Sequence, residues 1–169
     1  MKQLLTIILV VGFSALNAQN NNFLSASSPD GKYTINHLKG WTPSFNSGSE
    51  LSLKANGTSV ENIPIQLALT KEENLLPTTT IDNISSRNTL IIRQLLNAFI
   101  LENGTSTIDG NPANWISYTY EVNGRELQGI AYFFIKGGIA YQLVVHSSEG
   151  DFRTMEPLYR EIAESLEIK

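Results

Sequence analysis

Cysteine is absent from the 169-residue chain. Its absence excludes disulfide bonds, thiolate metal ligands, thiol catalysis and the attachment of a lipid to an N-terminal cysteine. Stability must therefore come from a hydrophobic core. A mature chain of about 150 residues buries roughly 70% of its unfolded surface, which is enough for one domain without covalent cross-links. We expect a single domain over residues 32–169.

Clusters of basic residues are also missing. The chain has 12 Lys and Arg against 16 Asp and Glu, and no stretch concentrates the cations. Nucleic-acid binding draws its affinity from clustered cations that neutralise phosphates. We therefore expect no nucleic acid and no anionic membrane surface as a partner.

Motifs for catalysis or cofactor binding are lacking too. The sequence has no Gly-x-Ser-x-Gly elbow, and its glycines form neither a phosphate loop nor a dinucleotide fingerprint. His37 and His146 stand singly on separate predicted strands, without an acidic ligand at a suitable spacing. This favours a structural or surface role over a metal pair. We expect no cofactor and no metal.

The first 18 residues have the pattern of a secretory signal peptide. Lys2 precedes the apolar run 4–13, and small residues lead to a cleavage site after Ala18. The run is about half of the ~20 residues that a membrane-spanning helix needs. The alternative, an N-terminal core helix, would give Lys2 no role. We expect a secreted or periplasmic protein that does not span the membrane, with a flexible leader at 19–31. Without Lys2, eleven basic and sixteen acidic residues leave a net charge of −5.

Residue spacing predicts an α+β protein. Alternating apolar residues predict strands at 32–37, 50–55, 63–69, 103–108, 113–122, 126–136 and 139–147. Spacings of three and four residues predict one helix at about 80–99 and a second at about 155–166, with Thr154 as its N-cap and Pro157 in its first turn. Turns are predicted at 39–43 and 109–112 and at the pairs 56–57, 103–104, 123–124 and 137–138.

The two-residue loops at 123–124 and 137–138 fix a strand register. This register places Tyr118 opposite Gly129 and Tyr132 opposite Leu143. One face of the sheet then carries Trp115, Ile130, Tyr132, Phe134, Tyr141, Leu143 and Val145, and the other carries Ile116, Tyr118, Tyr120, Leu127, Ala131, Phe133 and Val144. Because both faces are apolar, both need cover. We expect an antiparallel β-sheet flanked by helices on both faces.

Several short motifs resemble those of one family of secreted domains. They are the turn at 109–113 before a long strand, the Gly137-Gly138 hairpin before Ala140-Tyr141, the spaced Phe152, the closing Ser165-Leu166 and the early Gly40-Trp41. Together they resemble the PsbP-like and DcrB-like family over roughly residues 32–168. The resemblance implies an antiparallel sheet sandwiched by helices and an accessory or interaction role. It implies no catalytic residues, and the lipidated cysteine of some relatives is absent here.

The candidate ligand-binding residues are Tyr118, Gly129 and His146. The register places the side-chain-free Gly129 between two amphipathic rings, and a glycine inside a strand is one sign of close approach by a ligand. The alternative is that Gly129 lets a ring or helix pack down.

Two other groupings have simpler interpretations. Glu121 and Glu126 lie opposite each other in the register, and paired carboxylates can act as acid and base. At a hairpin tip, however, two splayed surface side chains are the simpler reading. The stripe of Trp115, Tyr132, Phe134 and Tyr141 could stack on a sugar, but at alternating spacing it is typical of a core.

These observations favour a non-enzymatic binding or accessory domain of the cell envelope, with an envelope protein or a small ligand as its partner. An envelope hydrolase that uses scattered carboxylates is the alternative, because fold class does not exclude activity. A subunit of a larger assembly is a third possibility. It would expose a contiguous apolar patch.

Overall fold

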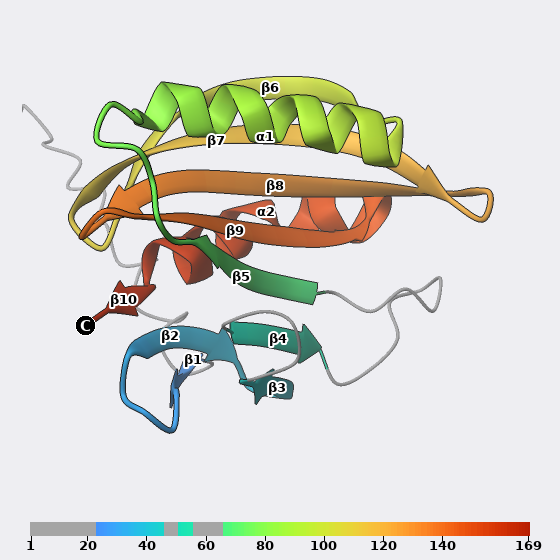
Figure 1. Cartoon of the computed structure of the whole chain (residues 1–169). Coiled ribbons are helices and arrows are strands. Elements are labelled where there is room, and N and C mark those ends of the chain that lie inside the picture. Colours follow the sequence, from blue (N-terminus) through green and yellow to red (C-terminus); the bar gives the residue numbers. More distant parts are fainter. Residues whose placement is uncertain (1–22, 46–50, 56–65) are drawn as a thin grey trace, which may run out of the picture.

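The computed structural model of the chain describes residues 23–45, 51–55 and 66–169 (Figure 1). The predicted signal peptide, its cleavage site at Ala18 and the predicted turn at 56–57 lie outside these residues. Within them the fold is mixed α+β, with antiparallel sheets and two helices. Neither helix has the length and apolarity that crossing a membrane requires.

The larger sheet has seven strands in the order β3-β4-β5-β9-β8-β7-β6, and every neighbouring pair is antiparallel. Its long strands β7, β8 and β9 form a meander that dominates Figure 1. The strands are β3 (Trp41–Ser44), β4 (Leu51–Ala55), β5 (Gln66–Glu72), β6 (Phe99–Ile108), β7 (Asn111–Val122), β8 (Arg125–Lys136) and β9 (Ile139–Ser148). The predicted turn at 39–43 is shorter than expected, because Trp41 already belongs to β3.

A second, three-stranded sheet has the order β1-β2-β10, with β1 at Phe23–Ser27, β2 at Tyr33–Leu38 and β10 at Glu167–Ile168. Strand β1 corrects the expectation of a flexible leader over residues 19–31. Its backbone pairs with β2 from Phe23↔Leu38 to Ser27↔Thr34, and Ala26 is buried. Pairing with β2 orders this short segment, whose polar neighbours along the chain favoured a leader.

The predicted register of the meander is confirmed. Tyr118 lies opposite Gly129, and Tyr132 lies opposite Leu143. Two-residue loops close both hairpins, with positive φ at 123–124 and at 137–138. Positive φ at both central positions suits the right-handed twist of the flanking strands, which is why Asn-Gly and Gly-Gly occur there.

The predicted turn at Asn103-Gly104 is wrong, because both residues lie inside β6. Gly104 pairs with Trp115 of β7. A Cβ on Gly104 would come within 2.8 Å of Cζ2 of the Trp115 indole. The glycine is therefore needed for the close approach of a ring and not for a turn.

Helix α1 (Ile81–Leu96) begins as the sequence predicts. Thr80 is the N-cap, and its hydroxyl accepts a hydrogen bond from the backbone N–H of Asn83 (3.2 Å). The Asn83 side chain accepts one from the backbone N–H of Thr80 in return (3.0 Å), which completes a capping box. The helix ends earlier than expected. Asn97 adopts the left-handed conformation as C-cap, and Phe99 opens β6.

Helix α2 (Glu149–Glu164) begins about six residues before the predicted start at 155. Its N-cap is Ser148 and not Thr154, and the Ser148 hydroxyl accepts from the backbone N–H of Asp151 (3.3 Å). Pro157 therefore lies in the helix interior, where its ring lacks an N–H for the preceding turn. The predicted start is too late because proline is most frequent in the first turn of a helix, and the prediction placed Pro157 there.

Two hydrophobic clusters follow the alternation of the meander, and both predicted face assignments are confirmed. One cluster joins Tyr132, Phe134 and Leu143 to residues of α2 and β2. The other joins Tyr118, Ala131 and Phe133 to α1 residues. Helix α1 packs on β7 and β8, and α2 packs on β8 and β9 and also contacts β2. The edge strand β6 is left largely uncovered by α1.

Candidate functional site

The structure brings the three sequence-predicted residues together on adjacent strands. Gly129 of β8 pairs with Tyr118 of β7 on one side and with His146 of β9 on the other. A Cβ at Gly129 would lie 2.8 Å from Cζ of Tyr118 and 2.9 Å from its hydroxyl oxygen. The Tyr118 ring thus fills the space that the prediction assigned to a ligand. Ligand binding at these residues stays a prediction, and it requires Tyr118 to move.

Sequence reasoning did not identify the true neighbour of His146, which is Tyr120. The Tyr120 hydroxyl lies 3.1 Å from Nδ1 of His146, and the Tyr118 and Tyr120 rings are 5.8 Å apart. Burial lowers the pKa of His146 and raises the pKa of Tyr120 to about 12. Both groups are therefore neutral at neutral pH. This cluster is a packed, uncharged contact between β7 and β9 residues.

The aromatic stripe belongs to the core, as the simpler interpretation predicts. Tyr132 and Phe134 are fully buried, and Tyr141 is nearly so. The Trp115 ring lies close over Gly104, and the guanidinium carbon of Arg160 lies 4.1 Å from the ring centroid. The indole N–H donates to the carbonyl of Thr105 (3.3 Å). With these neighbours, Trp115 is held in place and has little surface left for a sugar.

The remaining candidates stay apart from any shared site. Glu121 and Glu126 are cross-strand partners, as predicted, and both are exposed beside the hairpin loop. His37 lies on β2, and its Nδ1 is 3.0 Å from the carbonyl oxygen of Leu38. His146 lies in the other sheet. In the part of the chain that the structure describes, no three His, Asp or Glu residues are grouped as metal ligands.

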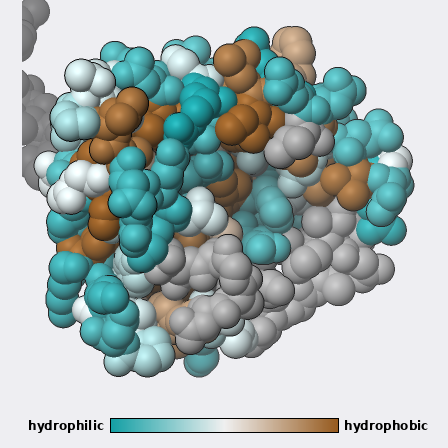
Figure 2. Space-filling model, in the orientation of Figure 1, coloured by the Kyte–Doolittle hydropathy of each residue, from teal (hydrophilic) through white to brown (hydrophobic). Residues whose placement is uncertain are grey.

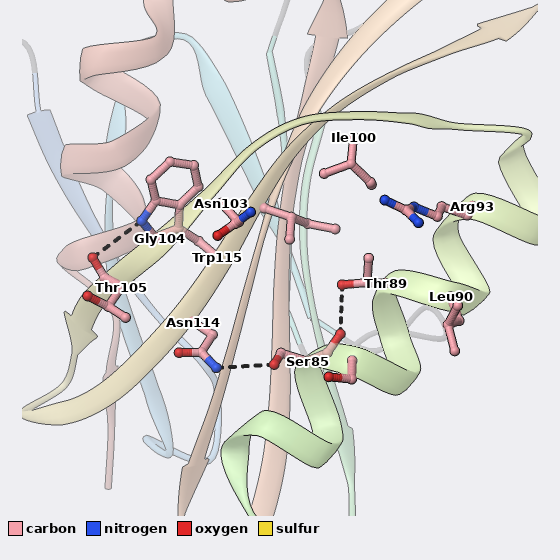
Figure 3. A pocket seen from close by; sticks show the side chains of 12 residues that line it. Ser85, Thr89, Leu90, Arg93, Ile100, Asn103, Gly104, Thr105, Asn114 and Trp115 are labelled. Carbon is pink, nitrogen blue, oxygen red and sulfur yellow. Dashed lines mark hydrogen bonds between the residues drawn. The ribbon is translucent and has the colours of Figure 1, made fainter.

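An open groove of about 530 Å³ lies between α1 and the strands β6 and β7 (Figure 3). This volume lies within the range of about 300–1,000 Å³ that is typical of ligand sites. The groove exists because α1 covers β7 and β8, whereas β6 extends beyond it. Its lining comprises Ser85, Ser86, Thr89, Leu90 and Arg93 from α1, Ile100, Asn103, Gly104 and Thr105 from β6, and Asn114, Trp115 and Ile116 from β7.

A β-bulge sets which β6 side chains face the groove. The pairing shifts between Ile100↔Tyr118 and Glu102↔Ser117. In a regular strand, residues three apart point to opposite faces of the sheet. The bulge adds one residue, so the face that α1 covers carries Ile100 as well as Asn103 and Thr105. Glu102 falls on the opposite face. The acidic residue of β6 is thereby kept out of the groove.

Hydrogen bonds hold the helix wall against β7. The side-chain amide of Asn114 donates to Oδ1 of Asp82 (2.9 Å) and to the hydroxyl of Ser85 (3.1 Å). The Thr89 hydroxyl donates to the carbonyl oxygen of Ser85 (2.7 Å). Figure 3 shows the contacts of Ser85 with Asn114 and with Thr89 on the helix side of the groove. They make this wall a fixed surface.

Other polar groups along the groove have no partner within the described ranges. Arg93 is exposed, and Figure 3 shows its guanidinium extending from α1 towards the β6 side. Hydrogen-bond and ion-pair partners are lacking among the described residues for the side chains of Ser86, Arg93, Asn103 and Thr105. Arg93 is also the only charged residue in the described part of the lining. The groove thus offers one cation and several hydrogen-bonding groups to a ligand.

Exposed hydrophobic side chains flank this groove. Leu90 is 56% exposed, and Phe99 and Leu101, on either side of Ile100, are 71% and 45% exposed. Figure 2 shows hydrophobic residues among hydrophilic ones in the upper part of the view, where Figure 1 places α1 and β6. A ligand in the groove would therefore meet apolar as well as polar surface.

No protein-family model and no curated protein sequence matches the chain. Solved structures do match it. The cyanobacterial PsbP protein CyanoP from Synechocystis is 14% identical, with a TM-score of 0.62 over 94% of this chain and 99% of that one. LpqN from Mycobacterium tuberculosis, described as involved in cell envelope biogenesis, is 12% identical, with a TM-score of 0.67 over 87% and 90%.

A third similar structure is the Ran-binding protein Mog1p of Saccharomyces cerevisiae. It is 8% identical, with a TM-score of 0.58 over 87% of this chain and 95% of that one. Identities this low show a common fold and do not transfer a function. The predicted resemblance is confirmed at that level: the chain has a PsbP-like fold.

Proposed function

We propose that this chain is a non-enzymatic binding domain of the cell envelope, secreted or periplasmic, whose ligand occupies the groove between α1 and β6–β7. The observation that carries the proposal is the groove itself. It combines a volume typical of ligand sites with polar side chains that have no partner among the described residues. Such groups can exchange their hydrogen bonds to water for hydrogen bonds to a ligand.

Three further observations support the proposal. The N-terminal pattern up to Ala18 is that of an exported protein. A structural neighbour, LpqN, is described as acting in cell envelope biogenesis. The two helices pack with different hydrophobic clusters, which supports a PsbP-like sandwich with a helix on each face.

Binding is favoured over hydrolysis by where the carboxylates lie. Glu121 and Glu126, the carboxylates that the register places opposite each other, do not line the groove and are exposed at a hairpin tip. A catalytic acid or base must lie within hydrogen-bond reach of its substrate. Among the described residues that line the groove, none is a carboxylate.

A thermal-shift screen of envelope metabolites tests the proposal, with sugars, amino acids, short peptides and lipid headgroups as the compounds. A ligand at 100 times its dissociation constant stabilises the fold by about 2.7 kcal/mol. Each hit is repeated on Thr105→Trp, which fills the groove, and on Thr107→Trp, its matched control. Thr107 is exposed, lies two residues further along β6 and points to the same face of the sheet as Thr105, but it does not line the groove.

We expect hits to lose their shift in Thr105→Trp and to keep it in Thr107→Trp. Hits that stabilise both variants equally would place the binding site elsewhere. A screen with no hit on the wild-type chain would contradict small-ligand binding and favour a protein partner.

A further inference from the structure

The charge of the groove is opposite in sign to the net charge of the chain. The chain is acidic, with 16 acidic against 12 basic residues. The groove reverses this balance, because Arg93 is the only charged residue among the described residues that line it. From this local charge we infer that the groove binds a hydroxyl-rich small molecule with one anionic group, of the class of acidic sugars. The inference rests on the proposed function and names its ligand class.

Arg93 supplies the anion-binding group. Its guanidinium is exposed and has no ion pair among the described residues. Arg87 on the same helix differs, because its guanidinium is bound to the carboxylate of Glu72. A free guanidinium presents a planar fork of donors that matches a carboxylate or a phosphate with two parallel hydrogen bonds. Arg93 is thus available to an anionic ligand, whereas Arg87 is already paired.

The groups around Arg93 suit hydroxyls. Asn103 and Thr105 project from β6 on the groove side, and Ser86 lies on the facing helix wall. An amide both donates and accepts, as does a hydroxyl, so each can bond to a sugar hydroxyl in either direction. Ile100, Ile116 and Leu90 add apolar surface for the C–H groups of a ring. The mixture of amide, hydroxyl and apolar groups around one cation is what an acidic sugar requires.

The test measures the affinities of four probes by calorimetric titration at low salt. D-Glucuronate carries a carboxylate with hydroxyls, and D-glucose 6-phosphate carries a phosphate with hydroxyls. D-Glucose carries hydroxyls alone, and acetate carries charge alone. A charge-assisted hydrogen bond contributes enough that one of the two acidic sugars should bind at least about tenfold more tightly than D-glucose or acetate. The preferred acidic sugar then distinguishes a sugar carboxylate from a sugar phosphate as the source of the anion.

Two matched variants assign the preference to one side chain. Arg93→Gln should remove the advantage of the acidic sugar and leave the affinity for D-glucose unchanged. Arg87→Gln makes the same change of charge on the same helix and should alter neither affinity by more than about twofold. Far-ultraviolet circular dichroism and unfolding midpoints establish that both variants fold.

The outcomes separate this inference from the proposed function. Equal affinity for D-glucuronate, D-glucose 6-phosphate and D-glucose, or an advantage that survives Arg93→Gln, would overturn the acidic-sugar inference. If sugar binding is then still lost in Thr105→Trp, the groove remains the binding site and the proposed function stands. If binding survives Thr105→Trp as well, both proposals fail. The absence of binding by all four probes also overturns the inference, while the wider metabolite screen continues to judge the function.

Discussion

Replacing Gly129 by alanine tests whether the space above this residue is filled or open. The new Cβ would lie 2.8 Å from Cζ of Tyr118 and 2.9 Å from its hydroxyl oxygen. Tyr118 is only 2% exposed, and its ring packs beside Tyr120, so it cannot swing freely into solvent. Atoms this close must move apart, and overpacking of this kind costs about 1–3 kcal/mol.

A smaller effect opposes this cost. Alanine in a strand is favoured over glycine by about 0.5–1 kcal/mol, because glycine loses more backbone freedom on folding. We therefore expect Gly129→Ala to lower the free energy of unfolding by about 1–2 kcal/mol. In urea unfolding followed by circular dichroism, the midpoint should fall by roughly 0.5–1 M.

Two controls isolate the clash. Tyr118→Leu removes the ring. In that background Gly129→Ala should leave the free energy of unfolding unchanged or raise it slightly. The double-mutant cycle should therefore give a coupling energy of about 1–3 kcal/mol between the two positions. Gly150→Ala, with open space around the new Cβ, should stabilise α2 by about 0.5 kcal/mol. Full stability of Gly129→Ala, or the same loss in both backgrounds, would refute the reasoning and restore the case for a cavity.

Three further predictions concern the core, a buried histidine and the N-terminus. Leu143 is fully buried, so Leu143→Ala should cost about 2–5 kcal/mol in denaturant unfolding, and a loss below about 0.5 kcal/mol would contradict its place in the core. Burial lowers the pKa of His146 below its usual value of about 6.5, so the unfolded chain binds the proton more tightly. The stability that His146 contributes is therefore complete above about pH 6.5 and is lost as the pH falls towards the lowered pKa. Unfolding midpoints between about pH 5 and 7 should show a smaller slope in His146→Gln, and an unchanged slope would assign the dependence to other groups. Finally, intact-mass measurement of the exported protein should give a chain that begins at or near Gln19, and a species that retains Met1 would disprove signal cleavage.

The meander could be predicted from the sequence because local chemistry fixes it. Asn123-Gly124 and Gly137-Gly138 close two-residue hairpins, and alternation then assigns each side chain to a face. The seven residues predicted on each face all belong to or pack against the corresponding cluster. The start of α1 is also set locally, because Thr80 caps the helix with its own side chain.

Other features depend on tertiary contacts that the sequence does not display. Strand β1 is short and contains two serines, and it is ordered by pairing with β2. Asp109 of the β6–β7 turn anchors β10 by accepting from the backbone N–H of Ile168 (3.1 Å). Asn103-Gly104 has the sequence of a tight turn but lies inside β6. A glycine is needed there because the Trp115 ring leaves no room for a Cβ. Helix α2 starts early because Ser148 caps it, which overrides the local signal of Pro157.

The candidate groove could not be predicted for a similar reason. It arises where α1 leaves the edge strand uncovered, and a bulge between Ile100 and Glu102 decides which β6 side chains enter it. Neither feature has a sequence signature. Nothing in the sequence distinguishes Arg93 from Arg87, because the difference depends on the tertiary contact between Arg87 and Glu72.

The proposed function places the ligand in the groove between α1 and β6–β7. The sharpest test is a two-dimensional amide NMR titration of the wild-type chain with D-glucuronate. We expect the largest shifts on the amides of residues 85–93 and 103–105. Shifts that centre instead on Tyr118, Gly129 and His146, with the groove amides unchanged, would place the ligand outside the groove.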